Sequence, residues 1–480
     1  MKLAITIGLV IAAAACGHPA PARSPVPPRT AVPWQSSGVD WSTPPPIGDA
    51  PRFLAPRIED FTLANGIRVL LVENHRLPII ELATLHMAAG SREDGAQPGL
   101  AALTVDLLDQ GAGARDASEL AAALDQQGAR LELRIATDYA SAQMTVLTNR
   151  FAETLEVLAD MLERPRFAET ALVRVRSRHV GELAQHRERQ RTIAAQAFDR
   201  LLFGSHAYGS PAEGVASVVG QLTAGGVRGF WQRAYTPNTM TVIVAGDVTR
   251  DQLAKLLDHA FGTWPAVPAA VPAGPEPART PALGYVDLPG AAKTAILIGR
   301  RAETTADLTA EVANMVLGGT ATARLDRKLR GELAITVGAG SSFWRGRLGG
   351  TWAAAATTPV AATADGIHAI LALIEDMRTI DVSAGEVAVA KTAMKRAVAQ
   401  AFETTSGTVR ALEHLVVEGL PLDHYATYAD RLDLVTPASL RSTIAPLWSD
   451  LSIVVVGDWS AIRESLQSLG RVPVALSLAR

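Results

Sequence analysis

The sequence predicts an α+β protein made of two homologous repeats, each with a mainly antiparallel sheet that carries helices on one face. Helical and alternating apolar patterns follow one another without the strict strand–helix alternation that a parallel α/β fold requires. An apolar strand that ends in Gly-Asp and leads into a helical stretch occurs twice, at 241–247 and at 452–458. With 480 residues, 48% of them hydrophobic and 19% charged, the chain can bury large cores.

The first repeat shows the change of apolar period most clearly. Residues 100–107 carry leucines three and four apart and predict a helix that is stopped by Gly111. Apolar residues alternate with other residues at 131–135 and at 142–146, which predicts paired strands with one buried face. Helical spacing returns at 151–162. Strands and helices of this kind, mixed in one repeat, indicate helices packed against a sheet.

Two pairs of landmarks indicate that the second half duplicates the first. Pro78 and Pro289 each precede an apolar strand, and they are 211 residues apart. Gly246 and Gly457, each in a Gly-Asp pair, are also 211 residues apart. A shared offset between independent landmarks is typical of an internal repeat.

Composition predicts where the parts of the chain begin and end. Two stretches are rich in proline, which favours extended polyproline conformation over a packed core. The predicted parts are a lipoprotein-type signal peptide at 1–16, a Pro-rich tether at 17–56, a first repeat at 57–265, a linker at 266–281 and a second repeat at 282–480.

The N-terminus is typical of an exported protein. A cationic start, the apolar run 3–11 and small residues at 12–15 describe a secretory signal that is too short to span a bilayer as a mature helix. Small residues directly before Cys16 resemble the lipobox of bacterial lipoproteins, whose cysteine is acylated. Ala13 stands where that pattern prefers Leu, so an ordinary cleaved signal stays open. Gly17 rather than Asp implies sorting to the outer membrane, and we expect a periplasmic protein of a bacterial cell envelope.

Charge and cysteine content exclude several kinds of partner and site. The net charge of −3 gives no electrostatic reason to expect nucleic acid, and contact with a membrane is expected only through the N-terminal lipid anchor. Cys16 is the only cysteine, so the mature chain has no disulfide framework and no thiolate metal site.

Several short segments, in the same order along the chain, resemble the pitrilysin/insulinase family of metallopeptidases. The resemblance covers about residues 52 to 475 and implies that the two repeats form a clam-like half chamber. The segments are Gly90-Ser91-Arg92-Glu93, Gly99-Leu100-Ala101, Gly204-Ser205-His206-Ala207-Tyr208-Gly209 with Gly214, Tyr235 to Met240, Val244 to Asp247, Leu317-Gly318-Gly319, Arg324-Leu325 and Leu329-Arg330.

The family resemblance implies a zinc ion held by His-x-x-Glu-His on the helix after Gly-Leu-Ala, with a distant Glu as third ligand. Histidines four residues apart share one helix face, and the Glu acts as base on zinc-bound water. In this sequence Ala102 and Asp106 stand at the two His positions and Val105 at the base, whereas Glu182 matches the distant Glu. Two carboxylates make a poor zinc site, and valine cannot accept a proton. We therefore predict no catalytic residue, no metal ligand and no cofactor in this chain, with Glu182 as a vestige.

A second metal-binding interpretation stays open. His179, Glu182 and His186 are spaced i, i+3 and i+7, so one helix face carries two imidazoles and a carboxylate. The charged residues at 187–189 favour a solvated surface instead.

The second repeat offers one substrate-contact candidate. Arg330 matches the Arg of the family's Leu-Arg-Glu pattern, and a structural ion pair is the alternative role for this residue. The family's nearby Tyr falls near Ile335, so its hydroxyl is missing here.

The leading hypothesis is a non-catalytic subunit that pairs with a zinc-bearing homologue in peptide hydrolysis, with the zinc in the partner. One alternative is a metal-dependent peptidase with a non-standard site that uses Asp106, Glu182 or the His179 face. Another is an envelope lipoprotein that binds peptides or acts as a scaffold without an enzyme partner.

Overall fold

The computed structural model describes residues 53–186, 189–266, 281–302 and 307–478. The predicted signal peptide, Cys16, nearly all of the tether and nearly all of the linker lie outside the described residues. The chain divides into the units Met1–Asp49 and Ala50–Arg480, and every element below belongs to the second unit.

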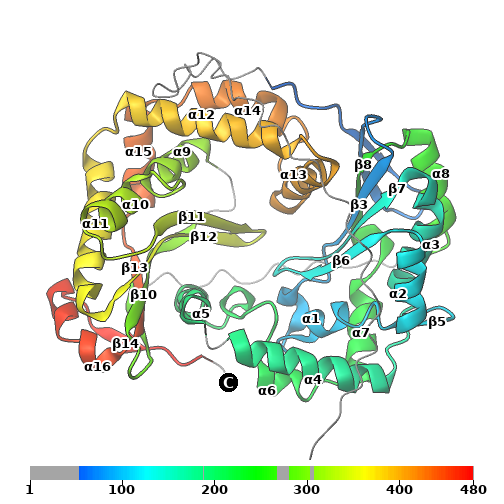
Figure 1. Cartoon of the computed structure of the whole chain (residues 1–480), viewed down its shortest axis with the longest axis horizontal. Coiled ribbons are helices and arrows are strands. Elements are labelled where there is room, and N and C mark those ends of the chain that lie inside the picture. The colour runs from blue at the N-terminus through cyan, green and yellow to red at the C-terminus, as the bar shows by residue number, and fades with distance from the viewer. Residues whose placement is uncertain (1–52, 187–188, 267–280, 303–306, 479–480) are drawn as a thin grey trace, which may run out of the picture. The chain divides into compact units, whose positions relative to one another are not determined.

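The first half contains eight strands, most of which join one sheet (Figure 1). The strands are β1 (Glu59–Thr62), β2 (Arg68–Glu73), β3 (Ile79–His86), β4 (Gly111–Ala112), β5 (Arg115–Asp116), β6 (Arg130–Ile135), β7 (Ala140–Leu147) and β8 (Met240–Gly246). The α-helices are α1 (Leu100–Val105), α2 (Ala117–Gln126), α3 (Phe151–Glu163), α4 (Glu169–His186), α5 (Gln190–Phe203), α6 (Ala216–Val219), α7 (Ala224–Ala234) and α8 (Arg250–Phe261). Short 3₁₀ turns are η1 (Ser91–Asp94), η2 (Thr148–Arg150), η3 (Ala207–Gly209) and η4 (Pro237–Thr239).

The second half follows the same plan. Its strands are β9 (Leu283–Asp287), β10 (Lys293–Ala302), β11 (Ala339–Gly346), β12 (Gly349–Pro359), β13 (Ser452–Gly457) and β14 (Pro473–Ala475). Its α-helices are α9 (Leu308–Leu317), α10 (Arg324–Asp326), α11 (Thr363–Thr379), α12 (Ala384–Ala401), α13 (Thr405–Glu418), α14 (His424–Asp433), α15 (Pro437–Leu447) and α16 (Trp459–Ile462). The remaining turns are the π-helix η5 (Arg327–Glu332) and the 3₁₀ segments η6 (Val360–Ala362) and η7 (Ser465–Leu469).

The two six-stranded sheets have matching strand orders, which confirms the predicted fold class. The first sheet runs β6-β7-β3-β8-β2-β1 and the second runs β11-β12-β10-β13-β9-β14. In both sheets the neighbouring pairs are antiparallel from the first strand to the fourth, and the fourth and fifth strands are parallel. Only the last strand differs, because β1 precedes its sheet in the chain and pairs antiparallel, whereas β14 follows its sheet and pairs parallel.

Strand register corrects one of the predicted landmarks. Leu71 pairs with Val244 in the first sheet, and Tyr285 pairs with Val455 in the second. Leu71 and Tyr285 are 214 residues apart, whereas Val244 and Val455 are 211 apart. The repeat is therefore genuine, but its offset is not the same at every strand.

Pro78 and Pro289 are not equivalent positions. The Pro78 carbonyl accepts the N–H of Thr148 at 3.0 Å, and the matching bond in the second half joins the N–H of Val360 to the Ala292 carbonyl at 3.3 Å. The β2–β3 and β9–β10 connections have the same length, five residues each, and the position of Pro78 at the end of the first corresponds to Ala292, three residues after Pro289. The common spacing of the two prolines is a coincidence.

Two predicted helices also differ in length. The stripe at 100–107 ends as a helix at Val105, because the N–H groups of Leu107 and Leu108 bond to carbonyls three residues earlier and tighten the chain into turns. The helical stretch expected after the Gly-Asp pair at 457–458 is two short pieces, α16 and η7.

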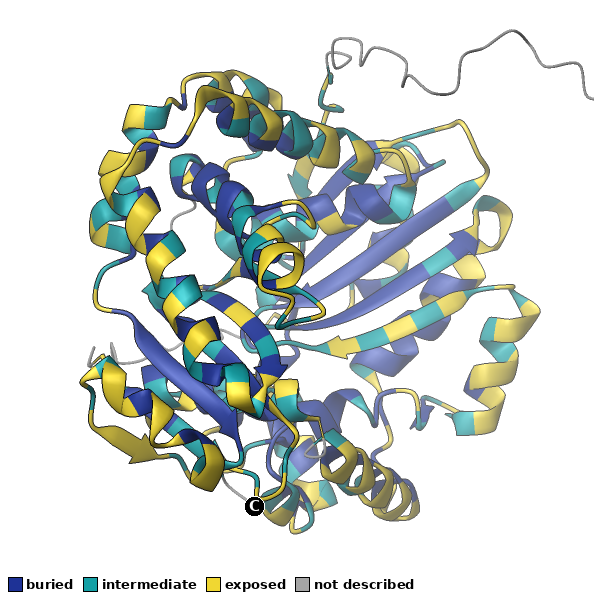
Figure 2. Cartoon of the chain, turned by 60° about the vertical axis from the view of Figure 1, so that its left-hand side comes forward, coloured by how far each residue is buried: buried dark blue, intermediate teal, exposed yellow. Residues whose placement is uncertain are grey.

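Each half has its own core between the sheet and its helices, and burial falls toward one sheet edge. The central strands β3 and β8 are buried almost throughout, and the edge strand β6 alternates between exposed and half-buried residues (Figure 2). That alternation is typical of a strand with one covered face. None of the described helices combines the length and apolar character needed to cross a bilayer.

The second face of each sheet is contacted by a helix from the other half. Helix α13 places Val409 and Leu412 against buried residues of β2, β3 and β8. Helix α5 places Ala197 and Phe198 against Val454 and its neighbours in the second sheet. This exchange joins the two halves through apolar contacts that helices on one face alone would not provide.

The exchanged helix α13 gives a stability prediction. Leu412→Ala removes a fully buried side chain from the contact with the first sheet and should lower the free energy of unfolding by about 2–5 kcal/mol. Leu434→Ala, at a position that is 79% exposed, is the matched control and should change it by less than about 0.5 kcal/mol. Urea unfolding followed by circular dichroism measures both, and equal effects would contradict the helix exchange.

Candidate functional site

Helix α1, which carries the degenerate zinc motif, begins at a close contact between two glycines. Gly99 has a φ of 103°, a left-handed conformation that favours glycine. A Cβ on Gly214 would lie 2.3 Å from the Gly99 Cα, so neither chain could approach as closely with a side chain present. This contact brings the 213–214 turn against the start of α1.

Asp94 caps the same helix, a role that the sequence reasoning missed. Its carboxylate accepts the N–H of Gly99 at 2.6 Å and that of Ala101 at 2.7 Å, which satisfies amides that have no partner inside the helix. Burial raises the pKa of Asp94 to about 7, and the two backbone N–H groups oppose that rise. An acidic residue shortly before a helix start is the sequence signal that could have revealed this cap.

The first two motif positions are buried. Ala102 is 1% exposed and Val105 is 3% exposed. Val105 belongs to the main core cluster of the first half, with Leu103 and Leu107. Neither side chain has a polar atom that could bind a metal or take a proton.

Asp106, at the third motif position, is hydrogen-bonded to His179 of helix α4. The Asp106 Oδ2 lies 2.8 Å from His179 Nδ1, and His179 Nε2 lies 2.8 Å from the carbonyl oxygen of Glu213. Both ring nitrogens therefore face acceptors, an arrangement in which only the doubly protonated imidazolium donates both hydrogen bonds. His179 is 6% exposed, and no ring nitrogen is left with a lone pair for a metal.

The environment of His179 favours its charged form. Burial lowers the pKa of His179, but the hydrogen bonds to Asp106 and to the Glu213 carbonyl outweigh burial, so that the pKa lies above the usual value of 6.5. The resulting ion pair connects α1, α4 and the 213–214 turn.

The other residues of the predicted metal face do not join His179. Glu182 is exposed, and its carboxylate lies 3.7 Å from the Arg178 guanidinium. His186 lines a separate 380 Å³ pocket with Leu183 and Arg200. Within the described ranges, no group of three or more His, Cys, Asp or Glu side chains is arranged to hold a metal ion.

The residues at the implied zinc position do not fit the ion. Two of the positions are apolar, and Asp106 accepts a hydrogen bond from a histidine that is itself fully occupied. A catalytic zinc site normally has three protein ligands. At this position no imidazole has a free nitrogen that could bind the ion. We derive no catalytic step through a metal in this chain.

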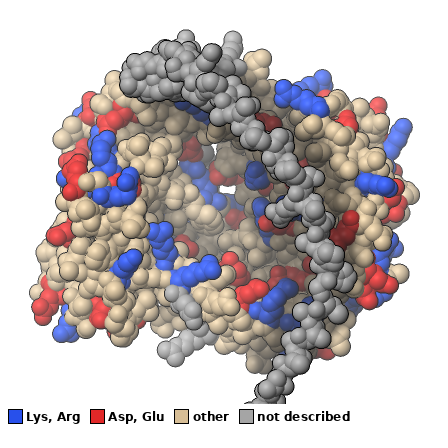
Figure 3. All heavy atoms as spheres, viewed as in Figure 1, with Lys and Arg blue, Asp and Glu red and all other residues tan. Residues whose placement is uncertain are grey.

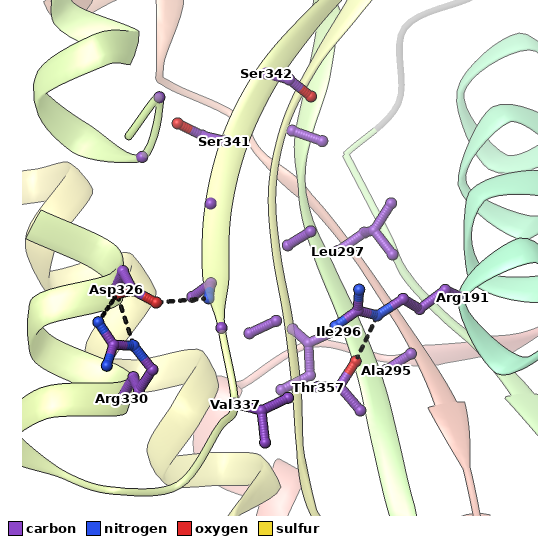
Figure 4. A pocket seen from close by; sticks show the side chains of 18 of the residues that line it. Arg191, Ala295, Ile296, Leu297, Asp326, Arg330, Val337, Ser341, Ser342 and Thr357 are labelled. Carbon is purple, nitrogen blue, oxygen red and sulfur yellow. Dashed lines mark hydrogen bonds and ion pairs between the residues drawn. The ribbon is translucent and has the colours of Figure 1, made fainter. Parts of the chain in front are cut away.

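A larger pocket of 790 Å³ lies where helix α5 of the first half faces the second sheet. Its walls include residues 338–342 at the start of β11, the Gly318–Gly319 turn after α9, and Arg191 of α5 (Figure 4). Strand β11 is the edge strand of its sheet and pairs with β12 alone among the described strands. The outer edge of β11 is occupied at this pocket, because the Ser341 N–H donates to the Gly318 carbonyl at 3.0 Å and the Ser341 carbonyl accepts from Asn314 Nδ2 at 3.2 Å.

Arg330, the substrate-contact candidate, lines the pocket in an ion pair. Its guanidinium lies 2.6 Å from Asp326 one helical turn earlier, and its side chain is 52% exposed (Figure 4). The Asp326 carboxylate also accepts the N–H of Ala339 at 3.4 Å, so the pair contacts the beginning of β11. Ile335 packs against the core of the second half and presents no hydroxyl.

Charged side chains outside these sites are mixed in sign. Figure 3 shows Lys and Arg interspersed with Asp and Glu over the visible described atoms of that face, which is typical of a solvated surface.

Comparisons with known proteins agree on one family. The model described as Insulinase (Peptidase family M16) matches residues 68–213, and the model described as Peptidase M16 inactive domain matches residues 221–394. An uncharacterized zinc protease of Streptomyces coelicolor is 28% identical over 290 residues, which cover 58% of this chain and 59% of that protein. A non-peptidase homolog of Helicobacter pylori is 24% identical over 199 residues, covering 42% of this chain and 46% of that protein. The chain spans about half the length of the curated relatives it matches.

A solved structure confirms the fold. The peptidase M16 inactive domain from Pseudomonas fluorescens superposes with a TM-score of 0.79 at 20% identity, covering 83% of this chain and 98% of that chain. At this identity the likeness concerns the fold alone.

The ion pair at the former zinc position predicts a pH-dependent stability. Because the pKa of His179 is raised in the folded chain, its contribution is complete below about pH 6.5 and is lost as the pH rises through the folded-state value. Asp106→Asn should lower the free energy of unfolding by about 1–2 kcal/mol at pH 6, and by less at pH 9.5.

Glu182→Gln is the matched control, because Glu182 is exposed and its contact with Arg178 is long, at 3.7 Å. It should change the free energy of unfolding by less than about 0.5 kcal/mol at either pH. Urea titrations at the two pH values test the account, which fails if Asp106→Asn is equally harmless at pH 6.

Proposed function

The chain belongs to the insulinase (peptidase M16) family, and from this premise we propose that it is a catalytically inactive subunit that pairs with a zinc-bearing homologue. One observation carries the proposal. The positions of the zinc ligands and of the base hold Ala102, Val105 and Asp106, of which two are buried and apolar and one is bonded to His179. Zinc and the base for peptide hydrolysis then come from the partner chain.

The proposal keeps a peptide-binding role for this chain. Strand β6 is the edge strand of the first sheet, at the end that corresponds to β11 in the second, and an extended peptide can add to such an edge through main-chain hydrogen bonds. The 790 Å³ pocket beside β11 offers space for side chains, with small residues on its walls and Arg330 at its rim. Arg330 could then meet a peptide carboxylate or carbonyl, in exchange for its pairing with Asp326.

The cellular setting is part of the same proposal. Cys16 follows a signal-like segment, so we place the pair in the periplasm of a bacterium, with this subunit anchored to the outer membrane by an acylated cysteine. The Pro-rich residues 17–56 would act as the tether between anchor and subunit.

Two other functions are outcomes of the same test. A metal-dependent peptidase with a non-standard site would hydrolyse peptide without a partner. A peptide-binding or scaffolding lipoprotein would bind peptide and recruit no zinc-bearing homologue.

Co-purification tests the proposal. The full chain with a C-terminal affinity tag should be produced together with a homologue from the same organism that has an intact His-x-x-Glu-His motif. The purified complex is expected to contain both chains and about one zinc per pair, and to cleave a quenched fluorescent peptide. Replacing the motif Glu of the partner by Gln should abolish cleavage and leave the complex intact. Absence of a complex, or cleavage that survives this replacement, would contradict the proposal.

A further inference from the structure

A buried polar cluster connects the tips of two hairpins that come from different halves of the chain. One is the turn between β6 and β7, which carries Asp138, and the other is the two-residue turn Arg347–Leu348 between β11 and β12. Asp138 is 3% exposed, and so is Tyr208, which lies in η3 between them. These hairpins contain the edge strands of the two sheets.

Four sets of hydrogen bonds hold the cluster together. The N–H of Arg347 donates to Asp138 Oδ2 at 2.9 Å, and the N–H of Leu348 donates to the Tyr208 hydroxyl oxygen at 3.0 Å. The Tyr208 hydroxyl donates to the Asp138 carboxylate, with oxygen distances of 2.8 and 2.9 Å. The Arg92 guanidinium donates to Asp138 Oδ1 at 3.1 Å and supplies the opposite charge.

Packing at the tip leaves no room for a side chain at Gly346. A Cβ on Gly346 would lie 2.6 Å from Asp138 Oδ2 and 2.7 Å from the Tyr208 hydroxyl oxygen. The ring of Trp344 contacts the rings of Tyr208 and Phe203 edge-to-face, with centroids 5.1 and 6.4 Å apart. Strand β11 is thus held from the first half by both hydrogen bonds and aromatic contacts.

Burial keeps the hydrogen-bonding groups of the cluster bonded to one another and away from water. Burial raises the pKa of Tyr208, as does the nearby Asp138 charge, so the hydroxyl keeps its proton and remains a donor. In a two-residue hairpin turn the N–H groups are ordinarily solvated, whereas here they bond to buried side chains of another part of the chain.

We infer that Asp138 and Tyr208 are positioning residues that fix the β11–β12 hairpin relative to the first sheet. The pocket beside β11 then keeps its shape without a ligand, because the hairpin tip cannot move away from the β6–β7 turn. This inference rests on the proposed function only where it gives the fixed hairpin a purpose, which is to keep the pocket beside β11 preformed for a peptide.

Hydrogen–deuterium exchange with residue resolution, measured by mass spectrometry on the full chain without peptide, tests the inference. Tyr208→Phe removes the acceptor of the Leu348 N–H and should speed exchange at Leu348 by about tenfold or more. Asp138→Asn should speed exchange at Arg347 instead. The amide has one acceptor oxygen, and when this oxygen accepts from the Tyr208 hydroxyl, the amide NH2 group faces the Arg347 N–H, which then has no acceptor.

Tyr235→Phe is the matched control. Tyr235 is 2% exposed, and its hydroxyl has no hydrogen-bond partner among the described residues, so the variant should leave exchange at 339–350 unchanged. Faster exchange confined to 339–350 in the first two variants supports a positioning role. Unchanged exchange in both, or an even increase across the chain, overturns it. Because no peptide is present, a failure of the peptide-binding proposal would not alter these results.

Discussion

The contact between Asp106 and His179 determines what the first half of this chain can do. It joins α1 to α4 at the place where the family's motif would put a metal, and the Glu213 carbonyl completes the environment of the imidazole. Each ring nitrogen has an acceptor, which favours the imidazolium form and leaves neither nitrogen free to bind a metal. A hydrogen bond therefore connects the two helices without a metal, so the fold does not depend on a metal at this position.

The remainder of the structure is consistent with a chain whose two halves act as a unit. Helix α5 covers part of the second sheet and helix α13 covers part of the first, so that separating the halves would expose apolar surface on both. The polar contact at Asp138 and Tyr208 adds a directional bond at the tips of the edge hairpins. Apolar exchange supplies the stability of the junction, and the buried hydrogen bonds specify its geometry.

Sequence reasoning reached the fold class, the duplication and the loss of the zinc motif, because these follow from local period and from residue chemistry. It matched Pro78 to Pro289, whereas register shows that Ala292 holds that position. The second half is three residues shorter between β10 and β13, which a count between landmarks does not reveal. It grouped His179 with Glu182 and His186 on one helix face, but the side of α4 that packs on α1 buries His179 and leaves Glu182 exposed. The partners of Asp138, Tyr208 and α13 are far away in sequence, so no local sequence pattern predicts these contacts.

Zinc content of the isolated chain tests the central claim most directly. The purified protein should be incubated with excess zinc, passed over a desalting column and analysed by inductively coupled plasma mass spectrometry, with peptide cleavage measured in parallel. Because α1 offers alanine, valine and an occupied aspartate, we expect well below 0.1 zinc per chain, about the level of a non-specific background, and no cleavage. One zinc per chain together with peptide cleavage that EDTA abolishes would contradict the account.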